Sequence, residues 1–337
     1  MLAILLCAFG VINASAQPKT PAPKPKSEPD VVRPPRIRSV PGTPTYPAYA
    51  NQTSERSITV DPNVNIKMCV AKGSLKINGW ERNEVRVFVR SGRLPGFRVL
   101  EKNPESGKAN WLQVLHVRAE GTPPGFRPEC LDAQEIELDV PITAKMDLTG
   151  RSTETVIDSI KKVSVKTAEG DISIRNIAGG ISATTYQGNL IVESSEGSIV
   201  LETTSGNILA FGVNPGQIGD LFKARAGSGT VTLQQVDHRQ IEASSISGGV
   251  NFKGKLLSGG LYSFKTSSGP IRLQIPLKSS FTVKAQYGFG GFESQIPLKF
   301  IYQNDTEGGK NLQATVGTGE SNINLITSQG SISIVKQ

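Results

Sequence analysis

The chain has 337 residues, of which 35 are glycine and 6% are aromatic, and its formal net charge is +8. This length can hold one large β domain or two smaller ones, and the high glycine content is typical of short strands joined by many turns. The Lys and Arg residues are spread along the chain without a compact run, which argues against a nucleic-acid-binding patch. A basic surface of this kind is still compatible with anionic partners such as acidic glycans.

Residues 1–16 form an apolar run that ends in Asn13-Ala-Ser-Ala16. The small residues Ala14 and Ala16 are typical of a signal-peptide cleavage site, so we expect the mature chain to begin at Gln17. No basic residue precedes the apolar run, which departs from the usual signal peptide. No later stretch is long and apolar enough to span a bilayer. We therefore expect an exported protein, located in the periplasm or at the cell surface.

Residues 17–55 are rich in proline with interspersed Lys and Arg, a composition that favours an extended linker over a packed core. Apolar and polar residues then alternate by twos, which predicts strands in an N-terminal β segment over residues 56–150. Cys69 and Cys130 are the two cysteines of the expected mature chain. An even pair in an exported chain predicts one disulfide, and two buried free thiols are the alternative.

From Val163 onward the sequence repeats one phrase, a turn centred on glycine followed by an apolar-polar-apolar triplet. The triplets open every nine residues, at Val163, Ile172, Ile181, Leu190, Ile199 and Ile208. A nine-residue step has room for a short strand and a corner. The period predicts an all-β chain whose residues 151–337 form a regular β-helix-like solenoid with right-handed coils. A β-sandwich and a meander are the alternatives.

The triplets also predict how the coils stack. If two strands make one coil, the triplets opening at Val163, Ile181 and Ile199 stack in one column, and the intervening triplets stack in the opposite column. Three strands per coil fit the same spacing, and the sequence leaves this open. The last triplet ends at Ile334, so we expect a terminal coil without a cap. Either residues 286–310 fold over it, or the protein forms oligomers through this C-terminal edge.

The candidate ligand-binding residues are three aromatics among glycines, Tyr287, Phe289 and Phe292. They would form a platform that stacks on sugar rings, and the alternative is that they fold back over the end of the core. The two Pro-Gly-Phe-Arg stretches, at residues 95–98 and 124–127, are interpreted as ordinary turns.

No catalytic residue, metal site or cofactor is predicted. His116 and His238 are the only histidines, and no Gly-x-Ser-x-Gly motif is present. The nine-residue repeats lack the paired glycines and regular aspartates of calcium-binding repeats. A carbohydrate-active enzyme remains an alternative, because carboxylates such as the pair Glu193 and Glu202 and the pair Glu169 and Glu196 would line up on one face of a solenoid.

Three features carry a family resemblance: the phrase G-x-[ILV]-x-[ILV], the segment from Gly73 to Val85, and Leu138-Asp-Val-Pro141 ahead of the dense repeats. Together they resemble a bacterial family of exported β-strand-repeat proteins, known as a domain of unknown function or "putative adhesin". The resemblance covers about residues 57–337. It implies a β-helix-like solenoid in the cell envelope, and the family offers no catalytic residues to carry over.

These observations predict a non-catalytic binding or structural module of the cell envelope or the exterior, with adhesin-like character. Its expected partner is a cell-surface polysaccharide or another envelope protein, and neither nucleic acid nor a membrane span of the mature chain is expected. Two alternatives stay open: a carbohydrate-active enzyme on the same scaffold, and a regulatory envelope partner of a membrane protein.

Overall fold

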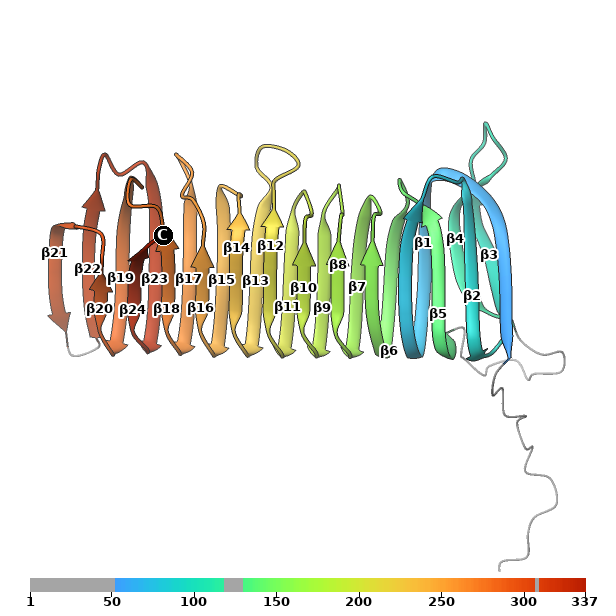
Figure 1. Cartoon of the computed structure of the whole chain (residues 1–337), viewed down its shortest axis with the longest axis horizontal. Helices are drawn as coiled ribbons and strands as arrows, with labels where there is room; N and C mark the ends of the chain where they lie inside the picture. The colour runs from blue at the N-terminus through green and yellow to red at the C-terminus, as the bar shows by residue number, and fades with distance from the viewer. Residues whose placement is uncertain (1–51, 118–129, 307–308) are drawn as a thin grey trace, which may run out of the picture. The chain divides into compact units, whose positions relative to one another are not determined.

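The computed structural model describes residues 52–117, 130–306 and 309–337. The expected signal peptide, the expected linker up to residue 51 and the loop at 124–127 lie outside the described residues. Every element in the described part is a strand, and no helix there is long and apolar enough to cross a membrane. The all-β solenoid expected from the sequence is confirmed (Figure 1).

Two strands make one coil, and the coils stack side by side (Figure 1). We call the stack of first strands sheet A and the stack of second strands sheet B. In the regular part, sheet A contains β7 (Lys162–Glu169), β9 (Ile181–Gln187), β11 (Ile199–Ser205), β13 (Leu221–Ser228), β15 (Gln240–Ser247) and β17 (Leu261–Ser268). Sheet B contains β8 (Ile172–Arg175), β10 (Leu190–Glu193), β12 (Ile208–Val213), β14 (Val231–Val236), β16 (Val250–Lys253) and β18 (Ile271–Ile275).

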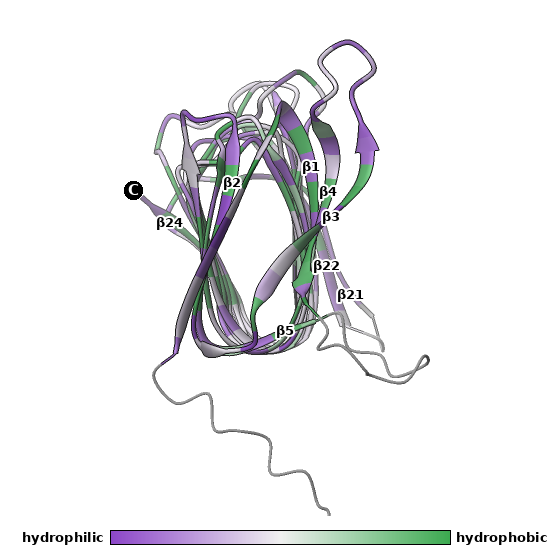
Figure 2. Cartoon of the chain, turned by 90° about the vertical axis from the view of Figure 1, so that its right-hand side faces the viewer, coloured by the Kyte–Doolittle hydropathy of each residue, from purple (hydrophilic) through white to green (hydrophobic). Residues whose placement is uncertain are grey.

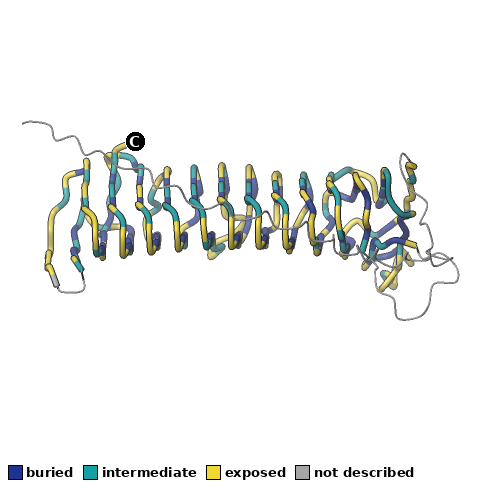
Figure 3. Tube along the Cα trace, turned by 90° about the horizontal axis from the view of Figure 1, so that it is seen from below, coloured by how far each residue is buried: buried dark blue, intermediate teal, exposed yellow. Residues whose placement is uncertain are grey.

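The strands of each sheet pair in parallel, and equivalent residues of neighbouring coils lie opposite each other. Both columns expected from the sequence are observed, with Val163, Ile181 and Ile199 in sheet A and Ile172, Leu190 and Ile208 in sheet B. The two-strand coil is therefore the one that forms. The first and third residues of each triplet point between the sheets and are buried, as the alternation along the trace shows (Figure 3). Figure 2, viewed along the stack, shows the two sheets facing each other.

Two long strands join the repeats to the N-terminal end. β6 (Lys145–Asp158) forms a whole coil, because its first half pairs with β7 and its second half pairs with β8. β1 (Thr53–Trp80) stacks on β6 in the same way and begins inside the expected linker. β4 (Ala109–His116) and β5 (Leu131–Pro141) lie parallel to β1, in sheet A and sheet B respectively.

Antiparallel strands close the N-terminal end of both sheets. β3 (Pro95–Lys102) pairs with β4 in sheet A. β2 (Glu84–Gly92) pairs with β5 in sheet B, and the first residues of β1 pair with β2. A disulfide joins Cys69 of β1 to Cys130, which directly precedes β5, with the two Cα atoms 4.4 Å apart.

The C-terminal end is built out of sequence order. Its strands are β19 (Phe281–Phe289), β20 (Phe292–Ser294), β21 (Lys299–Thr306), β22 (Gly309–Val316), β23 (Ser321–Gln329) and β24 (Ile332–Lys336). β23 lies between β17 and β19, and β24 lies between β18 and β20. The last triplet is therefore not an open end of the solenoid, and the expected alternative in which residues 286–310 fold over it agrees with the structure. The coil of β19 and β20 covers it, and β22 and β21 extend sheet A further as antiparallel strands.

A column of glycines forms the corners that lead from sheet A to sheet B. Gly229 has a φ of +137°, and a Cβ atom built on it would lie 2.1 Å from the carbonyl oxygen of Gly206 in the preceding coil. A corner such as that of Gly229 therefore needs glycine for its backbone conformation and for the close approach of the next coil. Buried hydroxyls beside the corners bind these carbonyls, as Thr203 Oγ1 does with Gly188 O at 2.9 Å.

We predict that Gly229→Ala lowers the free energy of unfolding by about 2–3 kcal/mol, because the side chain meets backbone atoms and the residue needs a positive φ. Urea denaturation measures the change. Gly291→Ala is the matched control, since a Cβ there meets no atom within 4 Å. Equal loss in both variants would show that corner stacking is not what holds the coils together.

We predict that the double variant Cys69→Ser/Cys130→Ser loses about 2–4 kcal/mol of stability. The two cysteines are 61 residues apart in sequence, and cross-linking a loop of this length restricts the unfolded chain. Chemical denaturation with and without dithiothreitol measures the effect. The reductant should lower the stability of the native chain to that of the variant and leave the variant unchanged.

Candidate functional site

The three predicted aromatics do not form one platform. Tyr287 is buried between the sheets, and its ring stacks on that of Phe292 with 6.3 Å between the centroids. Burial raises the pKa of the Tyr287 hydroxyl, and the nearby Asp305 carboxylate adds to this. Phe289 is 80% exposed, whereas Tyr287 is buried. The alternative that the aromatics fold back over the core thus describes Tyr287 and Phe292.

The carboxylates considered for catalysis lie apart. Glu193 follows the inward Val192 of β10, on the outer side of sheet B, whereas Glu202 is on the outer side of sheet A in β11. Glu169 is the last residue of β7, next to one corner, and Glu196 lies at the opposite corner, before β11. The carboxylate row of a carbohydrate-active enzyme is therefore not formed by these residues. Among the described residues, no group of three or more His, Cys, Asp or Glu is placed to hold a metal ion.

Both histidines are part of the interior. His116 is buried in β4. His238 lies in the turn between β14 and β15 and is 0% exposed, with its ring edge against Phe222. Its Nε2 donates a hydrogen bond to the carbonyl oxygen of Gly197 at 2.8 Å. Burial lowers the pKa of His238, although the Gly197 carbonyl and the carboxylates of Asp220 and Asp237 act in the opposite direction.

This burial makes the stability depend on pH. The folded chain keeps His238 neutral, while in the unfolded chain its pKa is near the ordinary 6.5. Stability is therefore full above pH 6.5 and falls as the pH drops below that value, because the unfolded chain binds a proton that the folded chain does not. We predict that His238→Gln flattens this fall between pH 7.5 and 5.5 in urea denaturation. Parallel profiles for the two proteins would contradict the assignment.

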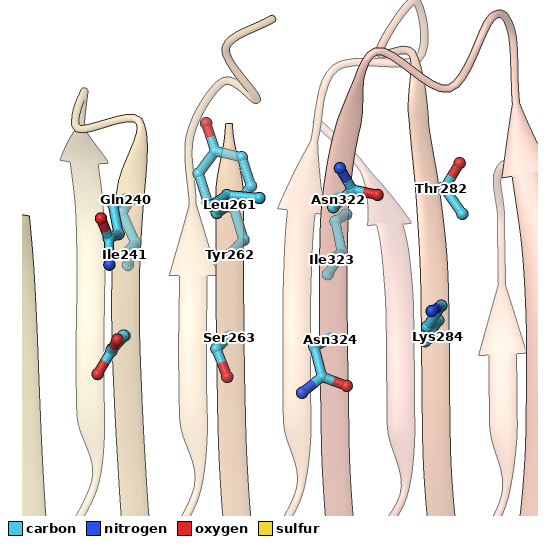
Figure 4. A pocket seen from close by; sticks show the side chains of 11 residues that line it. Gln240, Ile241, Leu261, Tyr262, Ser263, Thr282, Lys284, Asn322, Ile323 and Asn324 are labelled. Carbon is cyan, nitrogen blue, oxygen red and sulfur yellow. The ribbon is translucent and has the colours of Figure 1, made fainter. Parts of the chain in front are cut away.

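A polar hollow of about 400 Å³ lies on the outer side of sheet A, across β15, β17, β23 and β19 (Figure 4). We call it the amide hollow. The parallel register aligns its outward side chains in two rows, one of Gln240, Leu261, Asn322 and Thr282 and one of Glu242, Ser263, Asn324 and Lys284. The buried Ile241, Tyr262 and Ile323 lie beneath.

The shape of the amide hollow follows from the side chains in its second row. Ser263 is small, and it lies between the longer side chains of Glu242 on one side and Asn324 on the other. Neighbouring strands lie about 4.8 Å apart, which places Glu242 and Lys284 roughly 14 Å from each other at the two ends of the row. At this distance the two charges cannot form an ion pair with each other, so a ligand between them could contact both.

The outward polar side chains of the amide hollow are not used inside the described part of the chain. No hydrogen bond or ion pair joins the side chains of Glu242, Asn322, Asn324 or Lys284 to another described residue. The outer side of sheet B near the N-terminal end is different, because its charges are tied to one another in the ion pairs Arg86–Asp139, Arg90–Glu135 and Arg175–Asp158. Unpaired amides and hydroxyls in a recess are available for a ligand.

The sequence features described above do not single out the two asparagines of β23, Asn322 and Asn324. The alternation along that strand already shows that both side chains point outward. Their neighbours Ser263 and Lys284 could not be found, because β23 inserts between two strands that precede it in the chain.

Comparison with solved structures gives matches of low similarity. A "putative adhesin" from Bacteroides fragilis is 12% identical, with a TM-score of 0.34, and the match covers 86% of this chain and 99% of that one. Another from Parabacteroides distasonis is 12% identical, with a TM-score of 0.34 and coverage of 84% and 97%. A "putative cell adhesion protein" from Clostridium sporogenes is 12% identical, with a TM-score of 0.23 and coverage of 85% and 100%. With TM-scores this far below 0.5, these likenesses carry no argument about function.

No curated protein matches the chain. Residues 217–335 match the family described as Toastrack DUF4097. This stretch contains every strand that lines the amide hollow. The family resemblance found in the sequence is thus confirmed over residues 217–335.

Proposed function

We propose that the protein is a non-catalytic, adhesin-like binding module of the cell envelope or the cell exterior, and that it binds saccharides of a cell-surface polysaccharide in the amide hollow. The observation that carries this proposal is the set of outward amides, hydroxyls and charges in the hollow that no other described residue uses. The Cys69–Cys130 disulfide supports the exported location, because such bonds persist in oxidising compartments.

The chemistry of the amide hollow suits sugar hydroxyls. A carboxamide such as that of Asn322 or Asn324 offers both donors and an acceptor, so it can bind two neighbouring hydroxyls of one ring. Leu261 is 54% exposed and supplies an apolar contact beside them. Glu242 and Lys284 limit the recess at its ends and add charge-assisted hydrogen bonds.

The scaffold also favours binding over catalysis at this site. Only one carboxylate, that of Glu242, lines the amide hollow, whereas glycoside hydrolysis generally uses a pair. The two rows stand on strands whose backbone is paired on both sides, so their side chains start from fixed positions. A fixed array of polar groups loses little conformational entropy when a ligand binds.

The test is a binding screen of the full chain against immobilised neutral oligosaccharides, followed by calorimetry on the best ligand. We predict that Asn322→Ala/Asn324→Ala weakens binding about tenfold or more, because two hydrogen bonds of about 1 kcal/mol each are lost. Asn251→Ala, on the outer side of sheet B, is the matched control and should bind like the native protein.

Three results would contradict the proposal: no binding to any oligosaccharide, unchanged binding by the double variant, or cleavage of the bound oligosaccharide. Thermal unfolding of the variants shows whether a loss of binding reflects a loss of the fold. The substituted asparagines have exposed or half-buried side chains, so the melting temperature should change little.

A further inference from the structure

A second hollow lies on the outer side of sheet A, near the N-terminal end. We call it the lysine hollow. It is lined by outward side chains of β4, β1, β6 and β7, and the buried Ile66 and Met146 form its floor. Its polar and aromatic lining consists of Asn65, Lys67, Trp111, Lys145, Asp147, Lys162 and Ser164.

The register sets these side chains in order. Trp111 of β4 lies opposite Asn65 of β1, Asn65 lies opposite Lys145 of β6, and Lys145 lies opposite Lys162 of β7. Trp111 and Lys145 are thus two strand spacings apart, or about 10 Å. The indole of Trp111 is 44% exposed, which leaves part of its surface free for contact.

The lysines of this hollow are arranged at a cost to stability. Lys145 and Lys162 lie directly opposite each other on adjacent strands, and like charges in that position repel. No ion pair joins either of them, or Lys67, to another residue of the described chain. Near the N-terminal end of sheet B, outward charges are instead matched with opposite charges, in Arg86–Asp139, Arg90–Glu135 and Arg175–Asp158. Most residues of a protein favour its fold, and a pair of residues that opposes the fold is typical of a functional position.

We propose that the lysine hollow binds an acidic saccharide. A sugar ring stacks on Trp111, and a carboxylate or sulfate group on the same or the next sugar lies between the ammonium groups of Lys145 and Lys162. That anionic group turns the repulsion between the two lysines into attraction. Lys67 adds a third positive charge, and Asp147 accepts a hydrogen bond from a sugar hydroxyl.

Asp147 also makes the lysine hollow favour a saccharide over other anionic ligands. Its carboxylate stands opposite Lys67 within the basic cluster, where it would repel a nucleic-acid backbone, in which every unit carries a phosphate. Binding to an anionic membrane would call for a broader apolar surface than the single indole in this recess. A sugar polymer offers neutral hydroxyls beside its acidic groups and fits the mixed lining.

The lysine hollow is independent of the amide hollow. Six strand spacings separate β6 from β17, which corresponds to about 29 Å along the outer side of sheet A. The inference therefore does not rest on the proposed function. Neutral oligosaccharides and the asparagine variants test the amide hollow, whereas acidic oligosaccharides and the variants below test the lysine hollow.

The experiment titrates the full chain with oligogalacturonate, with a heparin oligosaccharide and with a neutral oligosaccharide of similar length, and records tryptophan fluorescence. The chain has two tryptophans, Trp80 and Trp111, so each serves as the control for the other. An acidic oligosaccharide should change the emission of the native protein and of Trp80→Phe but not that of Trp111→Phe. The two acidic probes distinguish a carboxylate ligand from a sulfate ligand.

Charge variants test the lysine pair. Lys162→Glu should weaken binding of the acidic oligosaccharide at least tenfold while the melting temperature stays equal or rises, because a repelling pair becomes an attracting one. Lys265→Glu makes the same charge change at an exposed lysine of β17 and should alter the affinity by less than about twofold. A loss of binding that accompanies unchanged or higher stability cannot come from misfolding.

Four outcomes would overturn the proposal. They are equal binding of the neutral oligosaccharide, equal or tighter binding of anionic phospholipid vesicles or a DNA oligomer, an equal loss of binding in Lys265→Glu, and an emission change that persists in Trp111→Phe. An equal loss of binding in Lys265→Glu would show that the general positive charge of the surface, rather than the lysine hollow, is responsible for binding.

Discussion

The close approach of one coil to the next is the constraint on which the rest of the structure depends. Parallel strands must come within about 4.8 Å along the whole coil, corners included. At Gly206 and Gly229 that distance leaves no room for a Cβ atom. The corner carbonyls are then enclosed, and hydroxyls such as that of Thr203 satisfy them. Once the corners stack, the register of every inner and outer side chain is fixed.

The repeated triplets made much of this fold predictable. An inward residue at every second position, with a glycine turn between triplets, is a local property that any short window of the sequence shows. The number of strands per coil was harder to predict, because a nine-residue step does not show which turns occupy equivalent places in successive coils. One signal was present: Asp171, Asn189 and Asn207 follow the corner glycines 18 residues apart, and their side chains bond to the next coil.

The order of the coils could not be predicted. Coils with similar apolar triplets and similar length can stack on one another in any sequence order, so nothing local shows that β23 inserts between β17 and β19. This insertion also made the amide hollow unpredictable, since it brings Asn324 beside Ser263 and Lys284. The prediction of an aromatic platform was wrong for a different reason. Tyr287 occupies an inward position of β19, and alternation along that strand outweighs its glycine-rich surroundings.

The register that packs the core also explains why the unpaired polar groups that we propose for binding lie in rows on the outer side of sheet A. Outward residues of successive coils fall into straight rows, whatever their type, because their inward neighbours determine the alignment. On the outer side of sheet B near the N-terminal end, the rows are filled with matched charges such as Arg175 and Asp158, which hold each other. On the outer side of sheet A, rows such as the one with Lys145 and Lys162 are left unmatched. Since the core and the corners already hold the fold, these outer rows can change with little cost to it, and recognition can vary on a constant scaffold.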